Sequence, residues 1–162
     1  MRRVRGLAIV ECLVAMTILS ATVLVTCYTL AAGQQHIYYG NRISTAVRLG
    51  RDLLEEATGR DYRERADTAV FGPEPDEESR AAFDDVDDYH DFTEPAGSLA
   101  DAAGVRYPAP DQVFRREVSV VAVTENVPEL GHAFAGLTVT VTVVGPGGQR
   151  WSFSRLLPEP GL

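Results

Sequence analysis

The longest hydrophobic segment of the chain lies close to its N-terminus. Residues 7–32 are almost entirely apolar and contain one charged side chain, Glu11. A helix of about 26 residues is about 39 Å long at 1.5 Å per residue, and the hydrocarbon core of a bilayer is about 30 Å thick. The pattern therefore predicts a membrane-spanning helix over 7–32 with a carboxylate near its beginning.

The hydrophobic pattern changes after this segment. In residues 33–60, apolar positions recur at intervals of three and four and are flanked by charged side chains. These positions are Ile43, Ala46, Val47, Gly50, Leu54 and Ala57. Such a period is typical of an amphipathic helix with one packed face. We expect the helix to continue through 33–60 as a soluble half, to end near Gly59, and to pack its apolar stripe on a sheet.

Apolar and polar side chains alternate in residues 112–162, which is typical of half-buried strands. The expected core positions are Val118, Val120 and Val121 within 113–125, Leu137, Val139, Val141 and Val143 in the next segment, and Trp151 and Phe153 in the last. A glycine-rich turn at 145–148 separates the last two segments, so they predict an antiparallel hairpin. The predicted fold class is α+β, with a long N-terminal helix packed on a small antiparallel β-sheet.

Residues 61–111 are rich in Pro, Gly and Asp and have no sustained period. They predict a long, acidic connecting region with short helical turns. Inside it, Phe83, Val86, Tyr89 and Phe92 recur at every third position, which suits a short helix. We expect these four side chains to anchor an acidic turn to the core.

The same stretch contains the aspartates Asp84, Asp85, Asp87 and Asp88. Carboxylates this close repel one another, and a hard cation such as calcium would relieve the repulsion through their oxygens. The spacing differs from that of an EF-hand loop, which has a glycine at its sixth position. Three interpretations stay open: a solvated acidic turn, a calcium site formed by these aspartates, and an edge that binds a partner protein.

Glu11 needs an explanation because a carboxylate in the hydrocarbon core costs about 2.5 to 3.5 kcal/mol. No other residue of 7–32 carries a charge that could pair with it. Cleavage after Gly6 would free the amino group of Leu7, one helical turn before Glu11. In a bundle of staggered chains, this amine and the Glu11 carboxylate of a neighbouring chain could neutralise each other, because a low dielectric strengthens their attraction.

Residues 2–11 resemble the class III signal of type IV pilins and pseudopilins: a short basic leader, a glycine before the cleavage site, and a glutamate at the fifth mature position. The resemblance implies a pilin-like fold. It implies that a prepilin peptidase cleaves after Gly6 and methylates Leu7, and that Glu11 acts in assembly with other pilin or pseudopilin subunits. The family usually has Phe and Thr at the first two mature positions, where this chain has Leu7 and Ala8.

A second similarity points to a smaller group within this family. The sequence Asp-Asp-Val-Asp-Asp-Tyr at 84–89 is similar to a stretch in minor pilins of the mannose-sensitive haemagglutinin pilus. The implied function is that of a minor pilin or pseudopilin in a type IV pilus-like filament, with a role in pilus assembly and cell adhesion or in protein secretion. A type II secretion pseudopilin is the alternative within this class.

Other functions of the N-terminal segment are open. A membrane-anchored periplasmic binding domain or enzyme would use residues 1–32 as an uncleaved tether. A secretory signal peptide also has a basic start, but its apolar region is normally about 7 to 15 residues long and uncharged. A lipoprotein signal would need a small residue before its cysteine, whereas Thr26 precedes Cys27 and Glu11 precedes Cys12.

Composition limits the location and the partners. A chain of 162 residues suffices for one membrane helix and one small domain. Its net charge of −8, which becomes more negative without the leader peptide 1–6, disfavours nucleic acid as a partner. By the positive-inside rule, Arg2, Arg3 and Arg5 predict a cytoplasmic N-terminus and a periplasmic or extracytoplasmic C-terminal domain. The resemblance implies that the precursor is an inner-membrane protein with its C-terminal domain in the periplasm.

The sequence contains no convincing catalytic motif. His36, His90 and His132 lie far apart without the spacing of metal ligands, and there is no nucleophile elbow. The glycines of 145–148 lie between two predicted strands, whereas a phosphate-binding loop precedes a helix. We therefore predict a protein that is not an enzyme and has no cofactor, apart from the calcium considered above.

Overall fold

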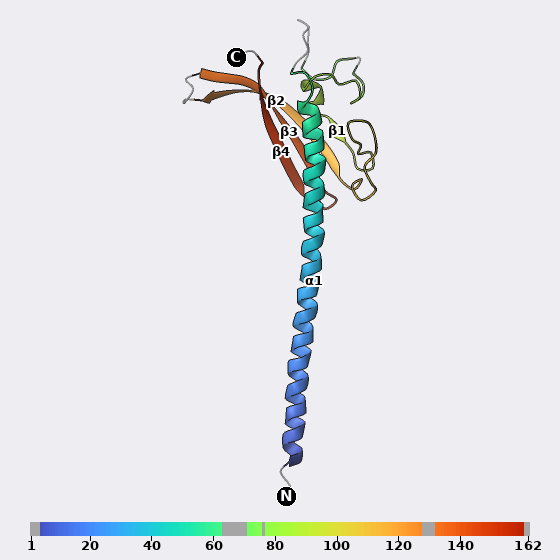
Figure 1. Cartoon of the computed structure of the whole chain (residues 1–162), viewed down its shortest axis with the longest axis vertical. Coiled ribbons are helices and arrows are strands. Elements are labelled where there is room, and N and C mark those ends of the chain that lie inside the picture. Colours follow the sequence, from blue (N-terminus) through green and yellow to red (C-terminus); the bar gives the residue numbers. More distant parts are fainter. Residues whose placement is uncertain (1–3, 63–70, 76, 128–131, 161–162) are drawn as a thin grey trace. The chain divides into compact units, whose positions relative to one another are not determined.

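The computed structural model describes residues 4–62, 71–75, 77–127 and 132–160. Its elements are helix α1 (Val4–Thr58), the 3-10 helix η1 (Asp87–Tyr89), and strands β1 (Thr93–Glu94), β2 (Arg115–Val127), β3 (His132–Val144) and β4 (Arg150–Pro158). One long N-terminal helix and a four-stranded antiparallel sheet give the predicted α+β arrangement (Figure 1). The chain forms two compact units, an N-terminal unit (Met1–Arg42) and a C-terminal unit (Ile43–Leu162), and α1 contributes residues to both.

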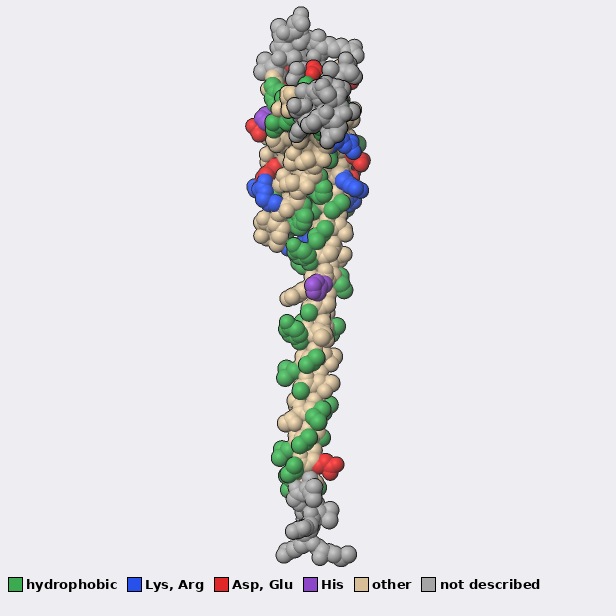
Figure 2. Space-filling view, turned by 90° about the vertical axis from the view of Figure 1, so that its left-hand side faces the viewer, with side chains coloured by type: hydrophobic (Ala, Val, Ile, Leu, Met, Phe, Trp, Pro, Cys, Tyr) green, Lys and Arg blue, Asp and Glu red, His purple; other side chains and the backbone are tan. Residues whose placement is uncertain are grey.

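The N-terminal unit consists of the first part of α1. Its apolar side chains are exposed, and the helix is long and apolar enough to cross a membrane (Figure 2). Four threonine hydroxyls in this segment each donate a hydrogen bond to a carbonyl three or four residues earlier, at 2.8 to 2.9 Å. They belong to Thr17, Thr22, Thr26 and Thr29. Because polar groups in hydrocarbon need an internal partner, these bonds make the segment compatible with lipid.

The sheet of the C-terminal unit has the strand order β1-β2-β3-β4, and every neighbouring pair is antiparallel. Val141 of β3 pairs with Val118 of β2 on one side and with Phe153 of β4 on the other. In the turn between β3 and β4, the Gly148 N–H donates to the Gly145 carbonyl at 2.9 Å. Gly148 has a φ of 78°, which favours glycine. The predicted hairpin is confirmed.

The core lies between the second part of α1 and one face of the sheet. Its buried residues from these elements are Ala46, Leu49, Leu53, Leu54 and Ala57 of α1 and Val118, Val120, Leu137, Val139, Val141 and Val143 of the strands. The predicted helix stripe lacks Leu49 and Leu53, and its members Ile43 and Val47 are only half-buried. Placing Val121 in the core is wrong: it is 50% exposed, because neighbouring strand positions point to opposite faces.

Gly50 of α1 packs closely against Phe153 of β4. A Cβ atom at this position would overlap the Phe153 ring and lie 3.2 Å from a Val143 methyl group. We expect Gly50→Ala to destabilise the C-terminal unit by about 1 to 3 kcal/mol, as overpacking does. Gly33→Ala is the control, because a Cβ there has nothing within 4 Å. Urea unfolding followed by the fluorescence of Trp151 measures both effects, and an unchanged midpoint for Gly50→Ala would contradict the close packing.

The described part of 61–111 is more ordered than a connecting region. It contributes η1 and β1, so the sheet has one strand more than the sequence pattern predicts. Phe83, Val86 and Tyr89 are buried in the core and Phe92 is half-buried, which confirms the predicted anchoring. The Phe83 ring packs edge-to-face on Tyr89 and Phe92, with centroid distances of 5.1 and 5.8 Å.

Candidate functional site

The first candidate site is the beginning of α1. Positions 6 and 7 lie within the helix, and Glu11 is an exposed carboxylate one turn after position 7. Within the described part of the chain, Glu11 has no hydrogen-bond or ion-pair partner. Its carboxylate is therefore available to a group on another molecule. The cleavage and methylation predicted at Gly6 and Leu7 stay predictions.

A second group of charged residues lies inside the C-terminal unit. Arg116 of β2 is completely buried, and its guanidinium binds the Glu94 carboxylate of β1, with Nε 2.7 Å from Oε2. The same guanidinium donates to the carbonyls of Leu49, at 3.2 Å, and Ala100, at 2.6 Å. These partners lie in β1, in α1 and in the loop after β1, so Arg116 joins the sheet to α1 and to that loop.

Arg80 extends this ion-pair network. It pairs with Glu56 of α1, with Nε 2.7 Å from Oε1, and its Nη1 lies 3.3 Å from Oε1 of Glu94. The Tyr89 hydroxyl also donates to Glu56, at 2.9 Å. Burial acts to raise the pKa of Glu56, but the hydrogen bond and charge of Arg80 outweigh it, so that this pKa lies below its usual value. Glu56 is therefore held as a paired carboxylate.

An open pocket of about 280 Å³ borders Arg80 and Glu94, and the network itself holds α1, the sheet and the loop after β1 together. The sequence pattern does not predict the network but carries one signal of it: Arg116 alternates with Phe114 and Val118, which puts a charge at an inward position of the strand. A charge at such a position needs a buried partner. Which acid provides it depends on the pairing of β1 with β2, and the sequence pattern does not show that pairing.

The aspartates predicted to bind calcium have different environments. Asp84 is exposed, whereas Asp85, Asp87 and Asp88 are buried, so the interpretation as a solvated turn is wrong for three of the four. One carboxylate oxygen from each of Asp84, Asp85 and Asp88 lies within 4.8 Å of the others. Asp87 is outside this group, and its Oδ2 accepts the Gly72 N–H at 3.2 Å.

Backbone N–H groups explain why the aspartates tolerate burial. Asp88 Oδ2 accepts the N–H groups of Asp84 and Asp85, both at 3.0 Å, and Asp85 Oδ1 accepts those of Asp87, at 3.0 Å, and Asp88, at 3.3 Å. Burial nevertheless raises the pKa of Asp88 to about 6, and the neighbouring Glu77 carboxyl group raises it too, against the lowering by these N–H groups. Glu77 was not among the predicted ligands.

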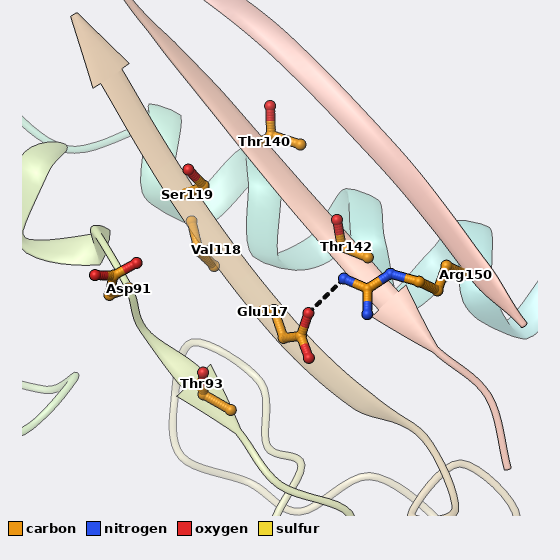
Figure 3. Close-up of a pocket in the computed structure, with 8 residues that line it drawn as sticks. All are labelled: Asp91, Thr93, Glu117, Val118, Ser119, Thr140, Thr142 and Arg150. Atoms are coloured by element: carbon orange, nitrogen blue, oxygen red, sulfur yellow. Dashed lines mark hydrogen bonds and ion pairs between the residues drawn. The ribbon is translucent and has the colours of Figure 1, made fainter. Parts of the chain in front are cut away.

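The sheet face opposite α1 carries a shallow polar depression of about 330 Å³ (Figure 3). Glu117 of β2 and Arg150 of β4 bind each other across it at 2.6 Å. The hydroxyls of Thr140 and Thr142 in its floor hydrogen-bond to serines of β4, at 2.9 and 3.0 Å. This surface offers hydrogen-bonding groups to a neighbour, but its residues do not form a nucleophile–base pair.

Comparison with known proteins adds no identification. No protein-family model matches the chain, and the searches of the curated proteins and of the solved structures give no match. The fold and the sites described above therefore carry the functional argument.

Proposed function

We propose that this chain is a minor pilin or pseudopilin, a membrane-inserted precursor that a prepilin peptidase processes and that assembles into a type IV pilus-like filament. The position of Glu11 carries the proposal. It is the one charged residue of 7–32, it follows Gly6 by five positions, and it has no partner in the described part of its own chain. A long N-terminal helix with a four-stranded antiparallel sheet also agrees with a pilin-like architecture.

Assembly would use an intermolecular ion pair. Cleavage after Gly6 gives Leu7 a new amino group, and the Glu11 carboxylate of an adjoining subunit neutralises it. The pairing is strong because the packed apolar helices exclude water, and either charge left alone in that environment is costly. Only one axial stagger between neighbours brings the two groups together, so the pair also sets the register of the filament.

The proposal includes a location and partners. The subunit is an inner-membrane protein before assembly, with its N-terminus in the cytoplasm and the C-terminal unit in the periplasm, because Arg2, Arg3 and Arg5 precede the apolar segment. Its partners are the prepilin peptidase and other pilin or pseudopilin subunits. The same chemistry serves a pilus and a type II secretion pseudopilus.

Intact-mass measurement of the membrane-extracted protein tests the processing step. The mature chain should begin at Leu7 and carry one N-terminal methyl group. Gly6→Leu should accumulate a precursor that is heavier by residues 1–6, because a bulky side chain blocks the cleavage site. Gly33→Leu, a matched change in the same helix where a Cβ has open space, should be processed normally. A wild-type chain that still begins at Met1 would favour the tether interpretation and exclude this one.

A further inference from the structure

Three carboxylates from two segments meet beside η1. One oxygen from each of Glu74, Glu77 and Asp88 lies within 4.8 Å of the others. A turn positions the first two, because the Glu77 N–H donates to the Glu74 carbonyl at 2.9 Å and the Glu74 N–H donates to Glu77 Oε2 at 3.1 Å. Three converging carboxylates repel one another unless a positive charge or a proton lies between them.

Asp88 supplies an independent observation. The residue is only 1% exposed, and its Oδ2 accepts two backbone N–H groups, whereas its buried Oδ1 accepts no hydrogen bond from the described residues. A buried carboxylate oxygen without a donor is rare in folded proteins and costs free energy. The neighbouring Glu77 carboxylate cannot stabilise it while both are ionised. Among the described residues Oδ1 therefore lacks a donor, and a cation or a proton would neutralise it.

The described arginine nearest to Glu77 in the sequence already binds other groups. Arg80 follows Glu77 by three residues, but its guanidinium binds Glu56, Glu94 and the Ala100 carbonyl. The whole sequence contains no lysine. Since the described side chains place no cation against Asp88 Oδ1, the site can take a cation from solution.

We propose that Glu74, Glu77 and Asp88 bind a calcium ion. Carboxylate oxygens are the ligands that hard divalent cations prefer, and calcium accepts six to eight oxygens in an irregular geometry that a turn and a 3-10 helix can provide. Magnesium fits less well, because it demands near-octahedral geometry and dehydrates reluctantly. The site differs from the one predicted from the sequence: Asp88 is common to both, whereas Glu74 and Glu77 replace Asp84, Asp85 and Asp87.

A bound ion would have a structural effect. Glu74 and Glu77 would hold it from one segment, and Asp88 of η1 would hold it from another. Apart from the ion, the hydrogen bond from Gly72 to Asp87 is a link between these two segments. Calcium would therefore fasten the outer turn to the part of the core that contains Tyr89.

Calorimetric titration of the full chain in detergent micelles, stripped of metal with a chelator, tests the site. We expect one calcium ion per chain, much weaker binding of magnesium, and a melting temperature that rises with the calcium concentration. Glu77→Gln should weaken calcium binding by at least about tenfold, as loss of a charged ligand does. Asp88→Asn should do the same, but because it also alters a buried group, Glu77→Gln is the decisive variant.

Two matched variants serve as controls. Glu78→Gln removes an exposed acid next to the site, and Asp84→Asn removes an exposed acid of the sequence-predicted set. Both should bind calcium as the wild type does. The proposal is wrong if no heat of binding is measured, or if Glu77→Gln binds as well as these controls. The proposal is also wrong if Glu77→Gln raises the melting temperature by the same amount in calcium and in chelator. That result would mean that the carboxyl groups of the wild type share a proton and bind no ion.

Discussion

Arg116→Met should lower the free energy of unfolding of the C-terminal unit by about 3 to 5 kcal/mol, the cost of removing one partner from a buried ion pair. Methionine fills much of the same volume but leaves the Glu94 carboxylate without its main partner. It also removes a hydrogen-bond donor from the Leu49 carbonyl and one of the two donors of the Ala100 carbonyl, which keeps its bond from Arg80. Urea unfolding of the full chain in micelles measures the loss through Trp151, whose ring packs near Phe114 with centroids 6.3 Å apart.

Arg150→Met is the matched control. Arg150 also pairs with a glutamate of β2, at 2.6 Å from Glu117, but its side chain is 54% exposed. An exposed ion pair contributes about 0 to 1 kcal/mol, so this change should have little effect. Equal losses for the two arginines would show that burial of Arg116 does not determine its contribution.

A double variant separates the charge from the packing. Glu94→Leu with Arg116→Met replaces both buried partners by apolar side chains, and such replacements are often nearly neutral. We expect the double variant to lose less stability than the sum of the two single variants. Some loss should remain, because Glu94 also binds Arg80 and the Ala100 N–H. Additive losses would contradict a direct coupling between Glu94 and Arg116.

The parts of the fold that were predictable are those with a regular local period. The three-and-four spacing in 33–60 gave the packed helix, and the twofold alternation around Val141 gave the hairpin of β3 and β4. Local periods decide which side chains share a face, whatever lies opposite. Leu49 and Leu53 were missed because the core covers a wider part of the helix surface than a single stripe.

The parts that were not predictable depend on contacts between distant segments. β1 has two residues, too few for any alternation, and it exists because it pairs with β2. Likewise, the sequence shows a cluster of aspartates but does not show the backbone N–H groups that bind the buried carboxylates of Asp85 and Asp88. The approach of Glu77 to Asp88 has the same cause, since the two residues come together only in the folded chain.

Glu11→Val should abolish most incorporation of this subunit into the filament while improving its insertion into the membrane. Insertion becomes easier because valine removes a carboxylate that costs about 2.5 to 3.5 kcal/mol in hydrocarbon. Assembly becomes harder because the Leu7 amine of the adjoining subunit loses its partner. If the ion pair favours the assembled state by only about 1.4 kcal/mol, its loss reduces incorporation about tenfold. This expectation rests on the proposed function.

Fractionation of cells that assemble the filament separates the two effects. Immunoblots of membranes and of sheared filaments should show Glu11→Val at the normal level in the first and strongly depleted in the second. Thr17→Val is the control, because the Thr17 hydroxyl bonds to the Val14 carbonyl of its own helix and needs no other subunit. A protein in which α1 is merely an anchor would behave alike with either substitution, since both leave the helix apolar and long enough to cross the bilayer. Normal incorporation of Glu11→Val would therefore remove the reason for assigning the carboxylate a role between subunits.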